Sequence, residues 1–147
     1  MEHFVKACDA DDALGCDFAG KLLAGCEPAL SADNGGPLVT DPRRGLAYLE
    51  HGCRLQSSAQ MFESAESCYA AAFFFAAGLK GKLDRNEEKA IELGSRACEM
   101  GQMRACKLVG DVLERAGRLE EAGRFHRRFS QMERQIKEQV TLEMQRT

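Results

Sequence analysis

The sequence predicts an all-α protein in which helical hairpins stack side by side as a solenoid and a long helix forms the C-terminal end. Three observations lead to this fold class. Six of the seven cysteines recur in a pattern that marks a repeating unit. Apolar residues on both sides of the last two cysteines follow the three- and four-residue spacing of helices. The end of the chain lacks glycine and proline and carries one apolar stripe.

The cysteines define the repeating unit. The first members of three sequential pairs are 45 residues apart, and their followers lie 8, 15 and 8 residues further on. The first members are Cys8, Cys53 and Cys98, and the followers are Cys16, Cys68 and Cys106. Removing two seven-residue insertions, one within 55–67 and one within 31–42, leaves a unit of 38 residues. A period of this length is typical of stacked helical hairpins.

The first complete hairpin has predicted helices near 15–23 and 42–55. Asp41 suits the cap of the second helix, and Pro42 suits its first turn. The segment between the two helices has the composition of a loop. Residues 1–10 look like the closing helix of a truncated unit.

The second hairpin has predicted helices near 65–79 and 86–100, and glycine follows at position 101, a usual place for a helix to stop. The third hairpin has a helix near 103–116 and another that begins near Leu119. The apolar residues expected to matter most to the middle unit are Phe73, Phe74, Phe75, Leu79, Ile91 and Leu93.

The last helix is predicted to continue along the third hairpin and cover it. Its apolar stripe is Phe129, Met132, Ile136, Val140 and Met144. The whole chain is predicted to be one domain. Its parts are a partial repeat at 1–14, repeat one with an inserted loop at 15–63, repeat two at 64–101, repeat three at 102–130 and a helical extension at 131–147.

Composition excludes several classes of protein. The 147 residues carry a net charge of −3 with 29% charged residues, which is unlike a nucleic-acid-binding domain. The strongest apolar run, 69–78, is about half of the roughly 20 residues that a membrane span needs. Residues 1–10 show no secretory signal. No nucleophile, phosphate-loop or HExxH motif is present, so no enzyme is predicted.

Seven cysteines have three explanations, namely disulfides in an oxidising compartment, a metal site, or small buried thiols. No CxxC motif and no Cys-His cluster with zinc-finger spacing occurs, which favours disulfides over zinc. The histidines, His3, His51 and His126, lie far apart in the sequence. We therefore predict no metal and no cofactor.

Glycine, alanine and cysteine recur together in a pattern that resembles the Sel-one-like repeat (SLR) family, especially its cysteine-rich branch. The segments that carry the resemblance are 96–113, with the motif AC-x-x-G-x-x-x-AC, 66–81, 85–98, 15–25 and 41–53. The resemblance covers most of residues 4–128. It implies a right-handed solenoid of helix-turn-helix repeats similar to TPR repeats.

Three disulfides are hypothesised within this pattern, Cys8–Cys16, Cys53–Cys68 and Cys98–Cys106. Each would tie the end of one hairpin to the start of the next. Loop-closure entropy assigns about 2.5 kcal/mol to each nine-residue loop and about 3 kcal/mol to the sixteen-residue loop. Cys26 remains as an accessible free thiol.

The leading functional hypothesis is a non-enzymatic scaffold for protein–protein interaction, because stacked hairpins present a curved surface. The resemblance implies the mitochondrial intermembrane space and a respiratory complex, cytochrome c oxidase, as the context for an assembly factor or accessory subunit. The alternative is a secreted or periplasmic bacterial repeat protein that binds host or cell-wall ligands. A third interpretation is a thiol enzyme that acts through Cys26.

The predicted partners are other proteins, namely respiratory-complex subunits or assembly intermediates. No nucleic acid and no transmembrane segment are predicted, and contact with a membrane would be peripheral. The start of the last helix is basic, and its arginines, Arg124, Arg127, Arg128 and Arg134, are the candidate partner-binding residues. They would meet an acidic protein or membrane headgroups.

Overall fold

The computed structural model describes residues 2–25, 40–55 and 58–146, and within them the protein is all-helical apart from one isolated β-bridge between Leu79 and Leu83. The elements are α1 (Glu2–Asp9), α2 (Ala13–Ala24), α3 (Pro42–Arg54), a 3-10 turn (Ser58–Gln60), α4 (Met61–Ala77), α5 (Glu87–Glu99), α6 (Met103–Arg115) and α7 (Leu119–Arg146). The all-α prediction is therefore confirmed. Cys26 and most of the predicted insertion within 31–42 lie outside the described residues.

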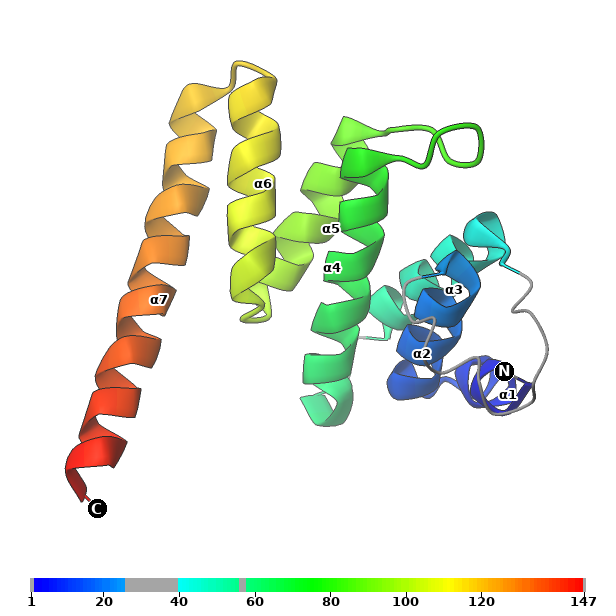
Figure 1. Cartoon of the computed structure of the whole chain (residues 1–147), viewed down its shortest axis with the longest axis horizontal. Coiled ribbons are helices and arrows are strands. Elements are labelled where there is room, and N and C mark those ends of the chain that lie inside the picture. Colours follow the sequence, from blue (N-terminus) through cyan, green and yellow to red (C-terminus); the bar gives the residue numbers. More distant parts are fainter. Residues whose placement is uncertain (1, 26–39, 56–57, 147) are drawn as a thin grey trace.

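The helices form a row from α1 at one end to α7 at the other (Figure 1). Each helix packs on the next one along the chain, and α2 also packs on α4 and α4 on α6. Within the described residues, the contacts between α3 and α5 and between α5 and α7 are less extensive than those of α4 with α2 and α6. We call the side formed by α2, α4 and α6 the inner side of the row, and the side formed by α3, α5 and the first half of α7 the outer side. The second half of α7 also reaches the inner side, where Ile136 lines a hollow with residues of α4 and α6.

Side-chain caps fix where several helices begin. The Asp41 carboxylate accepts a hydrogen bond from the backbone N–H of Arg44 at 3.2 Å, with Pro42 in the first turn, as the sequence predicts. Asn86 caps α5 in the same way, at 3.1 Å from the N–H of Lys89. Such caps satisfy backbone donors that the first turn of a helix leaves without a partner.

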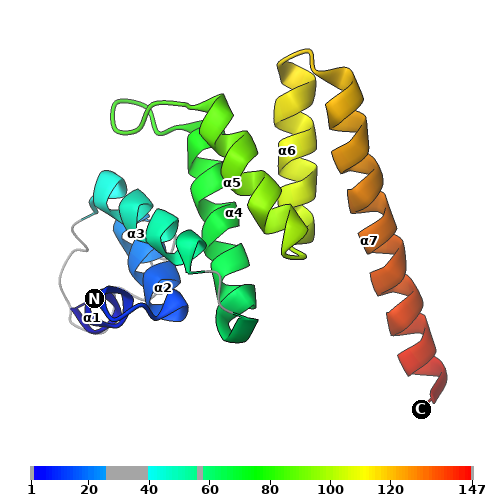
Figure 2. The ribbon, with the colours of Figure 1, turned by 180° about the vertical axis from the view of Figure 1, so that it is seen from behind.

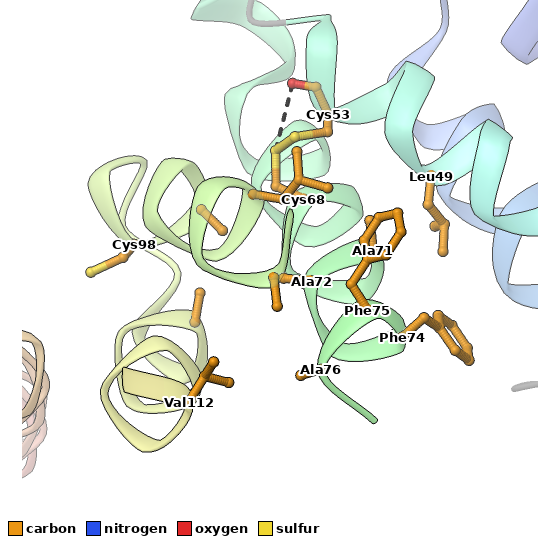
Figure 3. Close-up of a cluster of buried hydrophobic side chains, with 14 of the residues drawn as sticks. Leu49, Cys53, Cys68, Ala71, Ala72, Phe74, Phe75, Ala76, Cys98 and Val112 are labelled. Carbon is orange, nitrogen blue, oxygen red and sulfur yellow. Dashed lines mark hydrogen bonds between the residues drawn. A yellow bond between two sulfur atoms is a disulfide. The ribbon is translucent and has the colours of Figure 1, made fainter. Parts of the chain in front are cut away.

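Small residues let the helices approach closely. Gly45 of α3 lies against the backbone of α2, and a Cβ atom built on it would stand 2.7 Å from the carbonyl oxygen of Gly20. Gly94 of α5 likewise receives the side chain of Val109 of α6. The core is consequently rich in alanine and cysteine, with larger side chains such as Leu49 between them (Figure 3).

Phe73 is an exception to the predicted core. Its neighbours Phe74 and Phe75 are buried, whereas Phe73 is 48% exposed. Three consecutive positions on a helix point in three directions about 100° apart, so they cannot all face one core. The prediction that Phe73 stabilises the middle unit by burial is therefore wrong.

Only the first part of α7 packs on the third hairpin. Phe129 and Met132 pack against the core, and the Sδ atom of Met132 lies 3.7 Å from the Sγ atom of Cys106, near the start of α6. Beyond this point α7 runs past α6 (Figures 1 and 2), and Ile136 and Val140 are half-exposed. The last helix thus lies along the third hairpin, as expected, over its first half only.

The helix α7 is continuous across the predicted boundary at 130/131. The division of the chain into repeats and an extension remains a prediction. None of the described helices combines the length and the apolar character needed to cross a lipid bilayer.

We predict that Gly45→Ala destabilises the protein by about 1–3 kcal/mol, because the new methyl group meets backbone atoms that cannot move aside. Gly123→Ala in α7 is the matched control. Its methyl group would meet only the flexible end of Arg127, so the better helix propensity of alanine should leave stability equal or raise it by up to about 1 kcal/mol. Urea unfolding of both variants checks this, and equal stability changes would contradict the packing described.

Candidate interaction surface

Three disulfides connect successive hairpins. Cys8–Cys16 joins α1 to α2, Cys53–Cys68 joins α3 to α4 and Cys98–Cys106 joins α5 to α6, with Cα–Cα distances of 4.4, 4.5 and 4.8 Å. These are the three pairs hypothesised from the sequence. All six cysteines are buried. Disulfides of this kind persist in oxidising compartments, so the structure indicates such an environment for the folded chain.

A chain of charged side chains crosses the inner side of the row. The Lys21 ammonium of α2 lies 3.0 Å from the carboxylate of Asp17 and 3.8 Å from the carboxylate of Glu66 on α4. Glu66 also pairs with Arg104 of α6 at 3.2 Å and accepts a hydrogen bond from the side-chain amide of Gln102. The three inner helices are thus linked by opposite charges that already compensate one another.

Asp17 is the buried end of this chain. Burial raises the pKa of its carboxyl group, and Lys21 opposes the shift only in part. The Oδ1 atom of Asp17 and the hydroxyl group of Ser67 have no hydrogen-bond partner within the described residues. Because the raised pKa means that the fold disfavours the ionised form, the contribution of Asp17 to stability falls as pH rises through that pKa. Asp17 therefore affects stability and is too buried to meet a partner.

One face of α4 lines a groove on the inner side. Phe62, Glu66, Tyr69 and Phe73 follow one another at spacings of four, three and four residues, which places them along a single helical face. Phe62 is 74% exposed, the largest exposed fraction among the large hydrophobic residues described. A helix that presents two accessible aromatic rings on one face is a candidate interaction surface.

Two neighbouring hollows form this inner groove. The first, of about 240 Å³, is lined by Lys21, Glu66, Tyr69, Ala70, Phe73, Phe74 and Arg104. The second, of about 370 Å³, is lined by Phe62, Ala65, Glu66, Met100, Gly101, Gln102, Met103, Arg104 and Ile136. They share Glu66 and Arg104, and the Arg104 guanidinium lies 4.8 Å from the centre of the Tyr69 ring. The groove is therefore apolar at both ends and holds a compensated ion pair at its centre.

The predicted partner-binding arginines lie elsewhere, on the outer side. Arg124, Arg127 and Arg128 line a hollow of about 470 Å³ beside Glu99 at the end of α5. Arg134 does not line this hollow, although it shares a smaller one with Arg127. The structure thus brings together three of the four arginines.

The guanidinium groups of these four arginines form no ion pair with a carboxylate of the described chain, so they could bind acidic groups of a partner. In the described part of the chain, none of the four lies within 4.0 Å of a carboxylate oxygen, whereas seven other lysine and arginine side chains do. Arg128 donates to the carbonyl oxygen of Cys98 at 3.5 Å, which holds its side chain against the Cys98–Cys106 junction.

Two of the histidines connect their helices to other segments of the chain, one to α6 and one to the turn that follows α1. His126 of α7 lies 3.0 Å from the Asp111 carboxylate of α6, and His51 of α3 lies 3.0 Å from the carboxylate of Asp11. Partial burial alone would raise the pKa of Asp111, but hydrogen bonds from Lys107 and His126 together lower it. These contacts could not be predicted from the sequence, because the partners are 15 and 40 residues apart.

Among the described residues, two groups of side chains bring potential metal-binding atoms within 4.8 Å of one another. They are Cys8 with Cys16 and His51, and Asp111 with Glu114 and His126. In the first group the two sulfur atoms are joined as a disulfide. In the second, Asp111 already pairs with Lys107 at 2.9 Å, and the repulsion from that ammonium opposes a cation.

No protein-family model, no curated protein and no solved structure matches the chain. Its function has to be inferred from the inner groove and from the arginines of α7.

Proposed function

We propose that this protein is a non-enzymatic scaffold that binds an amphipathic helix of another protein in the inner groove. The observation that carries the proposal is the groove itself, with accessible Phe62 and Phe73 rings at its two ends and Ile136 on the opposite wall. Full burial of one such side chain contributes about 1.5–3 kcal/mol. Two or three of them suffice for the anchor residues of an interface.

A helix is the occupant that the groove favours. A segment inserted between apolar walls must satisfy its own backbone N–H and C=O groups, and a helix does this internally. The exposed residues of α4 and α7 are spaced by whole turns, so they match an apolar stripe of the same periodicity on a partner helix. Because Glu66 and Arg104 already neutralise each other, the matching stripe is expected to be apolar at both ends and small or polar at its centre.

The arginines of α7 are proposed to attract acidic residues of the same partner. Three unpaired guanidinium groups around one hollow give this end of the row a local positive charge, although the chain as a whole carries −3. Charges at the edge of an interface mainly raise the rate of association and its dependence on salt. They would steer the partner, while the inner groove holds it.

The family and location are proposed on the resemblance and on the disulfides. We propose that the helices are cysteine-rich Sel-one-like repeats in a right-handed solenoid, located in the mitochondrial intermembrane space. The partner would then be a cytochrome c oxidase subunit or assembly intermediate, and the protein an assembly factor or a bound accessory subunit. The three buried disulfides support an oxidising compartment, and they suit equally the alternative of a secreted or periplasmic protein that binds host or cell-wall ligands.

We predict that Phe62→Ser, Phe73→Ser and Ile136→Ser combined lower capture of cytochrome c oxidase subunits at least about tenfold, because about 1.4 kcal/mol of lost binding free energy has that effect. The tagged full-length chain is extracted gently from mitochondria, and captured subunits are quantified by mass spectrometry. Leu14→Ser with Leu119→Ser, two exposed positions outside the groove, is the control and should capture normally.

Two results would refute this use of the groove. One is capture by the groove variant at the wild-type level. The other is a wild-type chain that brings down no respiratory subunit. Light scattering on purified protein tests a second copy as occupant, and a dimer that the groove variant abolishes would contradict the proposed hetero-partner.

We predict that Arg124→Glu, Arg127→Glu and Arg128→Glu combined weaken the same capture and invert its salt dependence, because salt then screens a repulsion instead of an attraction. Lys6→Glu, Lys80→Glu and Lys82→Glu change the net charge equally at exposed sites away from the hollow. Capture by both variants is compared over a series of salt concentrations. Equal effects of the two variants would show that net charge, and not this cluster, is responsible.

A further inference from the structure

We propose that Cys8, Cys16 and His51 form a zinc site when the Cys8–Cys16 pair is in its dithiol form. The site would hold α1 against α2 and α3 in a chain that has not yet been oxidised. The inference is independent of the scaffold function, because it concerns the opposite end of the row from α7 (Figure 2).

The three donor atoms already lie close together. One ligand atom from each of the three residues falls within 4.8 Å of the others. In a tetrahedral zinc site with Zn–S near 2.3 Å and Zn–N near 2.0–2.1 Å, donor atoms are roughly 3.5 Å apart. Opening the bond between the two sulfur atoms therefore leaves only a small rearrangement before all three can coordinate.

The His51 ring is held as a zinc ligand usually is. Its Nε2 atom lies 3.0 Å from Oδ1 of Asp11, and zinc-bound histidines commonly donate their second ring N–H to a carboxylate. A proton on Nε2 leaves the lone pair on Nδ1, which we assign as the coordinating atom. Asp11 is itself positioned, because its backbone is in the left-handed region at φ 63° and its carbonyl oxygen accepts from Gln60 at 3.4 Å.

The other two disulfides do not have this surrounding. His51 offers a ligand atom within 4.8 Å of both Cys8 and Cys16. In the part of the chain that the structure describes, no histidine or carboxylate lies this close to both sulfur atoms of Cys53–Cys68 or of Cys98–Cys106. Cys98–Cys106 has the same eight-residue separation as Cys8–Cys16, so it is a matched comparison. What distinguishes the first pair is the imidazole that α3 brings to it.

Burial also suits a metal. Both sulfur atoms belong to fully buried cysteines, whereas the His51 side chain is 35% exposed. The protein therefore supplies two sheltered thiolates and one ligand at the surface, and a water molecule can complete the tetrahedron from the solvent side. Two buried thiolates without a cation would be costly, and Zn²⁺ neutralises both.

The chemistry balances without further reactants from the protein. Reduction by a phosphine consumes one phosphine and one water for each disulfide, and yields one phosphine oxide and two thiols. Zinc binding then releases two protons, because both cysteines coordinate as thiolates. A bound zinc ion occupies the sulfur lone pairs, so it should also slow the return of this pair to a disulfide.

The test is a zinc titration of the full chain against a chromophoric chelator. All proteins carry Cys26→Ser, are reduced with phosphine and are freed of it without oxygen. We expect one tight zinc ion per chain. Asp11→Asn should weaken its binding by about 10–100-fold, and His51→Ala should weaken it further, because outer-shell changes cost this much and ligand loss costs more.

The controls separate this site from zinc binding by any free thiols. Cys98→Ser with Cys106→Ser should leave the affinity for the tight ion unchanged, and the oxidised chain should not bind zinc at Cys8 and Cys16. The proposal is overturned if the reduced chain binds no stoichiometric zinc, if His51→Ala binds as tightly as the parent protein, or if loss of Cys98 and Cys106 weakens binding as much as loss of His51.

A second variant keeps the test valid should full reduction unfold the chain, which circular dichroism would show. Cys8→His cannot close the first disulfide but leaves the other two oxidised, and it offers an imidazole, the Cys16 thiolate and His51 to the metal. Cobalt, used as a spectroscopic substitute for zinc, should give a thiolate-to-cobalt absorption band in this protein. Equal cobalt and zinc affinities with and without His51→Ala would refute the site.

Discussion

The disulfides lie at the junctions between hairpins, where packing is less extensive, and they add a covalent link to each of these junctions. Contacts are most extensive in the pairs α2 with α3, α4 with α5 and α6 with α7, none of which is cross-linked. The cross-links join α1 to α2, α3 to α4 and α5 to α6. An eight-residue helix such as α1 is too short to be stable alone, so a covalent tie at its end contributes much to keeping it in place.

Both candidate surfaces are consequences of this arrangement. The inner groove lies between side chains of α4, α6 and α7, so its shape depends on the Cys98–Cys106 junction that fixes α5 against α6. The arginine hollow lies directly beside the same junction and includes Cys98 in its lining. A single covalent junction therefore positions a surface for apolar contacts on the inner side and a surface for acidic residues on the outer side.

Much of the fold could be predicted because local signals and pattern agree. Asp41 caps the helix that Pro42 begins, and the cysteine spacing led to the same three pairs that the structure joins. The rotation of a helix within the core is not local, however, and the run of three phenylalanines could not reveal that Phe73 faces outward. The contact of His51 with Asp11 likewise depends on how α3 is placed beside α1, which no sequence spacing encodes.

Mapping the disulfides of the non-reduced protein by mass spectrometry would show whether covalent junctions connect successive hairpins. Trypsin separates the cysteines of the second and third pairs, but cleavage at aspartate is needed between Cys8 and Cys16, because no lysine or arginine lies between them. We expect three linkages, Cys8 to Cys16, Cys53 to Cys68 and Cys98 to Cys106, with Cys26 as a free thiol. Seven free thiols, or linkages that exchange partners between these pairs, would contradict it.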